Sequence, residues 1–281
     1  MKKRSLLRNL ILTLLAVLIC FPLLMLLSCS IKGSDELKTL LMPVYAGSEE
    51  YANFSLLANY PTLMHYIKLL IFTPKFYTVF FNSIKMDGTI LILQMLIAVP
   101  GAWAFSRFCF PGKNLIFAIY VILMLMPFQV TMLSQYLLLN GLKMLNTHAA
   151  IILPAAFSTM LVFLIYRGFA SIPEELLDAA RVDGAGEFSI FLRIGIPLGS
   201  TGILSAAILS FLECYNMIEQ PLAFLKDQVL WPLSLYLPEI GGHFAGEGVA
   251  ASVITLIPAI LVFILGQDYL EKGIISSAMK G

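Results

Sequence analysis

Three polar side chains are spaced so that they share one face of an otherwise apolar helix. Glu213, Asn216 and Gln220 follow one another at intervals of three and four residues, which is the spacing of neighbours on a helical face. They lie at the end of the apolar run Gly199–Ile218, which is long enough to cross a bilayer. A carboxylate at membrane depth is costly and usually faces a cavity or a partner. Three roles therefore stay open: lining a solute pathway, pairing with another membrane subunit, or letting Glu213 reach the outer water.

Groups that could carry out covalent chemistry are not clustered in the sequence. The histidines show no metal-ligand spacing: His65, His148 and His243. The pair Gly112-Lys113 is reminiscent of a phosphate-binding loop, but Arg107 stands where that loop needs its first glycine, and Asn114 replaces its Ser or Thr. The sequence therefore predicts that this chain is not an enzyme and binds no metal or cofactor of its own. If ATP drives its action, another subunit supplies the ATPase.

The composition defines the surroundings of these groups. Of the 281 residues, 59% are hydrophobic and only 12% are charged, whereas ordinary soluble domains carry about 25% charged residues. So few charges cannot form the polar shell of a soluble protein, and so many apolar residues exclude a disordered chain. The formal net charge of +1 provides no basic field for nucleic acid. We therefore expect a protein embedded in a lipid bilayer.

The fold class expected is all-α: a polytopic membrane protein with six transmembrane helices in a single domain, residues 1–281. Uncharged apolar runs of membrane length lack the two-residue alternation of barrel strands. They are Asn9–Ser30, Gly88–Phe105, Leu115–Leu137, His148–Tyr166, Gly199–Ile218 and Val249–Gly266. Lys and Arg are denser on the side of the N-terminus, which predicts that both termini are cytoplasmic. Gln129, in the third run, is a further pathway candidate or a hydrogen-bonding contact between helices.

The loops between these runs differ in length and charge. The first outer loop, about 31–87, is long, and a short helix is expected at Tyr60–Leu70. The last outer loop, 220–248, is rich in Pro and Gly and is expected to be irregular. The inner loop at about 167–197 carries the densest charge of the inner loops.

A short helix is predicted inside this inner loop, at Glu174–Val182. Ser171 is expected to cap it, Pro173 fits its first turn, and Asp183-Gly184 ends it. One face would hold Leu176, Ala179 and Ala180, and another Glu174, Asp178 and Arg181. A second short helix is expected at about Glu187–Ile194. Because so short a helix is marginal in water, docking onto a cytoplasmic partner is favoured over resting on lipid headgroups.

The same loop resembles that of a known family. Asp178-Ala-Ala-Arg-Val-Asp-Gly-Ala185, followed by Ile194-x-Ile-Pro197, resembles the cytoplasmic-loop signature of ABC-importer permeases, E-A-A, then G, then I-x-L-P. Further segments are similar, in the same order, to carbohydrate permeases of the maltose type. They are Asn53–Leu56, Asn59-Tyr60, Asn82-Ser83, Ala104–Phe108, Phe110–Lys113, Gly141-Leu142, Asn146-Thr147 and the tail Ser277–Gly281. The resemblance covers nearly the whole chain.

The resemblance implies a fold, a location and partners. The fold would be that of a type I ABC importer permease in the bacterial cytoplasmic membrane. A second homologous permease subunit would form a heterodimer with it, two ATPase subunits would carry ATP and magnesium, and an extracellular binding protein would deliver a carbohydrate, expected to be an oligosaccharide. The ATPase-docking residues would be Glu174, Glu175, Asp178, Ala179, Ala180, Asp183, Gly184 and Ala185. The candidates for the substrate pathway are Glu213, Tyr215, Asn216, Gln220 and Gln129.

Two departures from the family pattern and two alternatives accompany this interpretation. Asp178 replaces the first Glu of the signature, and Tyr215-Asn216 stands where the family often has Trp-Asn. Tyr215 could stack on a sugar ring or serve as an interfacial anchor. The solute could also be something other than a sugar. A secondary transporter is the other alternative, but it predicts two similar halves, and no internal repeat is evident.

Overall fold

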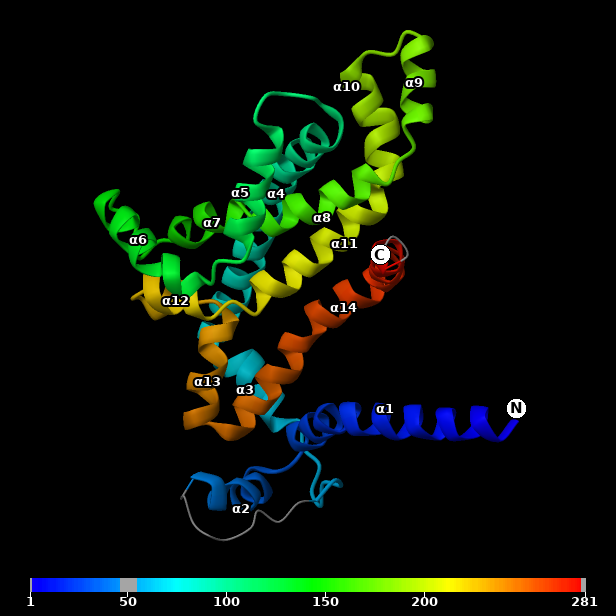
Figure 1. The fold of residues 1–281 in the computed structure, drawn as a ribbon. Helices are drawn as coiled ribbons and strands as arrows, with labels where there is room; N and C mark the ends of the chain where they lie inside the picture. The colour runs from blue at the N-terminus through cyan, green and yellow to red at the C-terminus, as the bar shows by residue number, and fades with distance from the viewer. Residues whose placement is uncertain (1, 46–54, 279–281) are drawn as a thin grey trace. The chain divides into compact units, whose positions relative to one another are not determined.

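The computed structural model describes residues 2–45 and 55–278. The beginning of the motif Asn53–Leu56 and the end of the tail Ser277–Gly281 lie outside these residues. Every regular element in the described ranges is helical (Figure 1), which confirms the all-α prediction. The chain divides into two compact units, Met1–Thr78 with Leu235–Ile257, and Val79–Ser234 with Pro258–Gly281.

The first unit contains the N-terminal helices and parts of three later ones. They are α1 (Lys2–Ser30), α2 (Ser34–Tyr45), α3 (Met64–Phe72), the start of α4 (Pro74–Arg107), most of α13 (Leu233–His243) and the first part of α14 (Ala245–Ala278). Ion pairs join these segments: Lys75 lies 3.7 Å from Glu239 of α13, and Lys68 lies 3.8 Å from Glu247 of α14. Most apolar side chains of α1 from Leu10 onward are exposed, which suits a helix surrounded by lipid or by another subunit.

The second unit contains the rest of α4, the end of α14 and all the helices between α4 and α13. They are α5 (Lys113–Met124), α6 (Phe128–Gly141), α7 (Ala149–Ala156), α8 (Thr159–Ala170), α9 (Glu174–Val182), α10 (Glu187–Ile190), the π-helix η1 (Phe191–Gly195), α11 (Ile196–Tyr215), α12 (Glu219–Phe224) and the 3₁₀-helix η2 (Gln228–Leu230). The elements α10, η1 and α11 follow one another without a break, so the spanning segment runs from Glu187 to Tyr215. The second short loop helix was expected to end near Ile194, and this part of the prediction is wrong.

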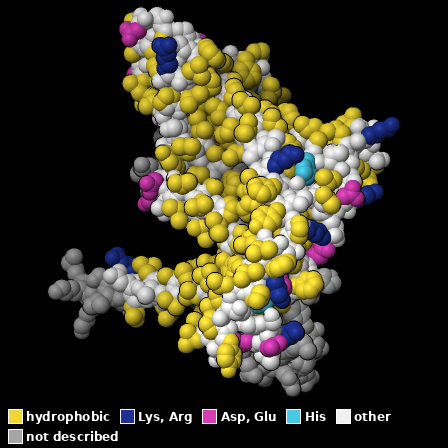
Figure 2. All heavy atoms as spheres, turned by 180° about the vertical axis from the view of Figure 1, so that it is seen from behind, with side chains coloured by type: hydrophobic (Ala, Val, Ile, Leu, Met, Phe, Trp, Pro, Cys, Tyr) yellow, Lys and Arg dark blue, Asp and Glu magenta, His cyan; other side chains and the backbone are white. Residues whose placement is uncertain are grey.

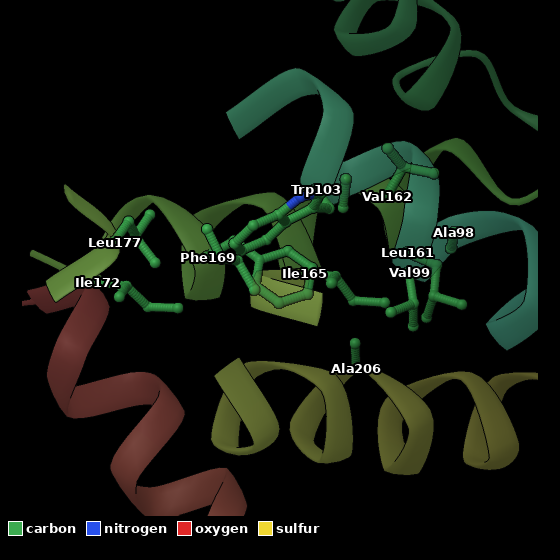
Figure 3. Close-up of a cluster of buried hydrophobic side chains, with 12 residues drawn as sticks. Ala98, Val99, Trp103, Leu161, Val162, Ile165, Phe169, Ile172, Leu177 and Ala206 are labelled. Carbon is green, nitrogen blue, oxygen red and sulfur yellow. The ribbon is translucent and has the colours of Figure 1, made fainter. Parts of the chain in front are cut away.

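Spanning helices α8 and α11 pack against each other through glycines. A Cβ atom built on Gly202 would lie 2.9 Å from the Cα of Gly168, so the two backbones touch where neither residue has a side chain. Small residues permit such close approach between membrane helices. Beside this contact, the ring of Trp103 from α4 meets the ring of Phe169 edge-on, at 5.1 Å between centroids, and Ile165 and Ala206 close the cluster (Figure 3).

Among the described residues, five helical segments are long and apolar enough to cross a membrane. They correspond to the first, second, fourth, fifth and sixth predicted runs. The third run, Leu115–Leu137, is not one straight helix: α5 and α6 meet at a bend of 99°, and they supply a sixth span only if the pair crosses together. Pro127 precedes α6 in an extended conformation, and proline has no N–H to continue the helix before it.

Two loop predictions are wrong in part. The first outer loop was expected to reach residue 87, but α4 already begins at Pro74, and the short helix within that loop lies at Met64–Phe72. The last outer loop, 220–248, was expected to be irregular, but it holds most of α12, all of η2 and α13, and the start of α14. Pro238 is accommodated inside α13, so proline content alone does not indicate irregular backbone here.

The exterior is largely apolar. Hydrophobic side chains cover most of the face drawn in Figure 2, and charged side chains occur there only in small groups. Large aliphatic residues on α5, α6 and the second half of α14 are exposed, including Leu115, Leu133 and Leu265. A contiguous apolar surface on a folded protein marks contact with lipid or with another protein, in agreement with the predicted membrane location.

Candidate functional site

The inner loop is held to the end of α4 by Arg107. Its side chain is only 5% exposed, and one guanidinium nitrogen, Nη2, donates to the carbonyl oxygens of Phe169 at 2.5 Å and Ile172 at 2.8 Å. The other, Nη1, donates to Glu174 at 2.6 Å. The guanidinium also lies over the ring of Trp103, 5.7 Å from its centroid. One side chain thus joins α4, the end of α8 and the first residue of α9.

A second arginine organises the polar side of the loop. Arg181 Nη1 donates to Asp178 at 2.7 Å and to Glu174 at 3.2 Å, while its Nε donates to Glu187 at 2.8 Å. These hydrogen bonds, above all the one that Arg181 donates to Glu187, raise the pKa of Arg181 above its ordinary value. The predicted polar face of Glu174, Asp178 and Arg181 is therefore present, and its groups bind one another.

The turn after α9 has the predicted geometry. Gly184 has φ of +82°, a conformation that glycine adopts readily and other residues avoid. Amide nitrogens of Asp183, Gly184 and Ala185 donate back to the last turn of α9, each at 3.0 Å. Ser171, in contrast, does not cap α9, because its hydroxyl donates to Gly168 at the end of α8, and Pro173 occupies the N-cap position.

The apolar face of α9 is divided differently from the prediction. Leu177 is fully buried in the cluster around Trp103, and Ala180 and Ala185 pack against the same cluster. Leu176 and Ala179 are exposed. Grouping Ala180 with these two residues was therefore wrong, because the side of α9 that carries Ala180 is turned toward this chain's own core.

An exposed apolar surface remains on this loop, and we call it the loop ridge: Leu176, Ala179, Val182 and Phe188. Val182 is 86% exposed and Phe188 is 73% exposed. Glu175 and Asp183 are also exposed beside it. An exposed apolar surface of this kind marks contact with a protein or with lipid. Of the predicted docking residues, Ala179 lies in the loop ridge, whereas Ala180 and Ala185 pack against the core.

The pathway candidates do not share one helical face. Glu213 is exposed on α11, but α11 ends at Tyr215, Asn216 follows as its C-cap, and Gln220 belongs to α12. The prediction that these residues share one face is therefore wrong, because it assumed a continuous helix. Gln129 lies near this break, since its amide donates to both carboxylate oxygens of Glu219, at 2.6 and 2.7 Å. Asn216 donates to the carbonyl of Leu212 at 2.8 Å.

Tyr215 is buried, unlike its neighbours Glu213 and Asn216. Its ring stacks on Phe211, with 5.5 Å between the centroids. It lines a small cavity together with Asp87 of α4 and Cys214 of α11. Asp87 was assigned to the end of the outer loop from the sequence and was not considered as a site residue, although an acidic residue directly before an apolar run was a visible signal.

Arg107 was missed as well, because the sequence analysis considered it only as a residue that breaks a phosphate-binding pattern. A basic residue at the inner end of a spanning run is usual, and its partners lie more than 60 residues away. Within the described residues, no group of three or more His, Cys, Asp or Glu side chains could hold a metal ion.

Long apolar helices joined by a charged helical loop define a polytopic membrane protein. The family model described as "Binding-protein-dependent transport system inner membrane component" matches residues 95–276, and this chain belongs to that family. It is therefore a transport subunit and not an enzyme, and the resemblance seen in the sequence is confirmed.

Relatives and a solved structure agree with this assignment. The chain is 30% identical over 272 residues to the arabinooligosaccharides transport system permease protein AraQ of Halalkalibacterium halodurans, covering 95% of this chain and 93% of that protein. It is 30% identical to the sn-glycerol-3-phosphate transport system permease protein UgpE of Salmonella typhi, covering 72% and 74%. A chain of a bacterial ABC transporter involved in the import of the acidic polysaccharide alginate has the same fold, with a TM-score of 0.80 at 21% identity, covering 95% and 96%.

Proposed function

We propose that this chain forms, with a second homologous permease subunit, a pathway for carbohydrate uptake across the bacterial cytoplasmic membrane. Both termini lie in the cytoplasm, and an extracellular binding protein delivers an oligosaccharide. The chief support is the extensive similarity to AraQ, a permease for arabinooligosaccharides, over 95% of this chain. A solute with hydroxyl groups also suits the break between α11 and α12, where Asn216 ends α11 and Gln129 reaches Glu219 of α12.

Coupling to ATP is assigned to the inner loop. The complex contains two separate ATPase subunits, which carry ATP and magnesium, and one of them docks on the loop ridge of this chain. Arg107 holds α9 against the core around Trp103. A movement of the ATPase docked on the loop ridge is therefore transmitted to α4, α8 and α11. The carboxylates of Glu174, Asp178 and Glu187 are engaged by arginines of this chain, which leaves the apolar tip and Glu175 for the partner.

The test is uptake by the purified complex. The transporter is isolated through a tag on this chain so that it retains its own partners, and it is placed in vesicles with its binding protein and ATP. We expect uptake of labelled arabinotriose that requires ATP. The similarity to UgpE makes sn-glycerol 3-phosphate the alternative solute; uptake of this compound but not of arabinotriose would refute the carbohydrate assignment and retain the permease assignment.

A further inference from the structure

A buried carboxyl group lies on α4, away from the loop ridge. Asp87 is 4% exposed, and its Oδ2 atom has no hydrogen-bond partner among the described residues. Ser83, one turn earlier on α4, is already engaged, because its oxygen accepts a hydrogen bond from the amide of Leu233 at 2.8 Å. A buried polar atom without a partner is destabilising, so its presence calls for a reason.

The space beside this carboxyl group is small and mostly apolar. Asp87 lines a cavity of about 10 Å³, roughly the room needed by one water molecule. A sugar ring cannot enter, but a single hydroxyl group can. The other lining residues are Ser83, Met86, Ile90, Ile151, Cys214, Tyr215, Met217, Pro221 and Pro232.

The charge of the lining selects the kind of group that could fill it. None of the lining residues is Lys, Arg or His, so the carboxyl group has no cationic partner in the cavity wall. A wall without a cation offers nothing to hold an anion, whereas the free oxygen of Asp87 can accept a hydrogen bond from an O–H donor. The chemistry therefore favours a neutral, hydroxyl-bearing ligand over a phosphate or another acid.

The cavity also lies where a pathway is expected to pass. Cys214 and Tyr215 are the last residues of α11, and Pro221 belongs to α12, so the wall spans the break between these helices. Interrupted helices at membrane depth persist where protein buries the free backbone or where it lines a cavity. On the exposed side of the same break lie Glu213, Asn216 and Gln129.

We propose that Asp87 is a substrate-binding residue that accepts a hydrogen bond from one hydroxyl group of the transported carbohydrate at the break between α11 and α12. Water occupies the position when no substrate is present. The inference rests on the proposed function and narrows it, because it places a specificity-determining contact within this subunit and excludes anionic solutes from that contact.

The experiment compares arabinotriose with its set of monodeoxy analogues, each lacking one hydroxyl group, in the uptake assay with the purified complex. In the wild type, one analogue should show a half-saturating concentration about tenfold above that of arabinotriose, the size expected for the loss of one hydrogen bond in a buried site. In Asp87→Leu, arabinotriose and that analogue should have equal half-saturating concentrations. In Asp87→Asn, which retains a weaker acceptor, the half-saturating concentration of the analogue divided by that of arabinotriose should fall by about threefold.

The control is Asp268→Asn, which removes an acidic group from an exposed position on α14 and should retain the wild-type ratio. If Asp87→Leu does not assemble, Asp87→Asn decides, because its side chain has the same size. If the Asp87 variants keep the wild-type ratio of half-saturating concentrations between the analogue and arabinotriose, this inference is overturned. Uptake of arabinotriose by the same complex would still support the proposed function. A change in thermal stability with unchanged ratios would likewise overturn it and leave Asp87 with water as its only ligand. Uptake of sn-glycerol 3-phosphate alone would overturn both.

Discussion

At the scale of single residues, Arg107 connects segments that the sequence separates widely. Its guanidinium donates to the carbonyl oxygens of Phe169 in α8 and Ile172 beyond its end, and to the carboxylate of Glu174. The hydrogen bonds to a charged donor are individually strong, and the low exposure of the side chain limits their screening by water. Arg107 therefore fixes the start of α9, in addition to the packing of Leu177 in the core.

We predict that Arg107→Met lowers the free energy of unfolding by about 3 kcal/mol, since two carbonyl oxygens lose a charged donor. Sugar uptake per ATP hydrolysed should also fall, because α9 is no longer fixed to α4. Titration with SDS measures the first effect, and uptake with ATPase assays on the complex measures the second. Arg167→Met, at an exposed position on α8, is the control; equal losses in both variants would contradict the role of Arg107.

Gly184 offers a test of backbone conformation without steric conflict. A Cβ atom at this position would meet nothing within 4 Å, but φ is +82°, so valine is strained there by about 1–2 kcal/mol. We predict that Gly184→Val leaves the protein in the membrane and sharply reduces uptake, with ATP hydrolysis uncoupled or lost.

Gly186→Val is the matched control for this change. Gly186 has equally open surroundings and an extended conformation with φ of −72°, which valine adopts readily. Its uptake, measured at equal membrane abundance, should stay close to that of the wild type. Full activity of Gly184→Val would show that the loop is only a connector.

At the scale of elements, α9 has an inner side and an outer side. Leu177 and Ala180 contact the core around Trp103, whereas Leu176 and Ala179 belong to the exposed loop ridge. Of the two adjacent alanines, Ala180 therefore packs within this chain, and Ala179 is available for contact with a partner. Their substitution distinguishes the two functions of one short helix.

Ala179→Glu should leave the thermal stability of the isolated chain unchanged but abolish copurification of the ATPase, because it places a carboxylate in the docking surface. Ala180→Glu should lower the free energy of unfolding by about 2 kcal/mol, because it forces a charge against the chain's own core. Glu175→Gln, beside the ridge, should change either quantity little. Loss of the ATPase from Ala180→Glu but not from Ala179→Glu, with stability intact in both, would reverse the assignment of the two sides.

The contact between α8 and α11 supplies a second element-level prediction. Because the Cβ of an alanine at 202 would lie 2.9 Å from the Cα of Gly168, Gly202→Ala should separate the helices and destabilise the protein by about 1–3 kcal/mol. Gly101→Ala, on α4 with nothing within 4 Å of its Cβ, should be neutral or slightly stabilising. SDS unfolding of the two variants provides the comparison, and equal stabilities would contradict the close contact.

At the scale of the whole molecule, the chain is one subunit of a transport complex. Its exposed apolar surface leaves room for lipid and for further subunits, and its family depends on a binding protein. We predict that the purified chain alone hydrolyses no ATP and that activity appears only with its ATPase partners. A phosphate-release assay on material freed of other ATPases checks this, and turnover by the isolated chain would refute the assignment as a pure transport subunit.

The sequence alone determined the membrane class, five of the spanning helices, and the bounds of α9 from Glu174 to Val182 with its turn at Gly184. These features depend on composition, on apolar runs and on residues adjacent in the chain, which act through local hydrogen bonds and backbone preferences. The tertiary structure decided the sharp bend between α5 and α6, the end of α11 at Tyr215, the partners of Arg107, the inward side of α9 and the burial of Asp87. Each of these depends on which distant segments pack together, and a hydrophobic pattern specifies that an element is buried without specifying what lies against it.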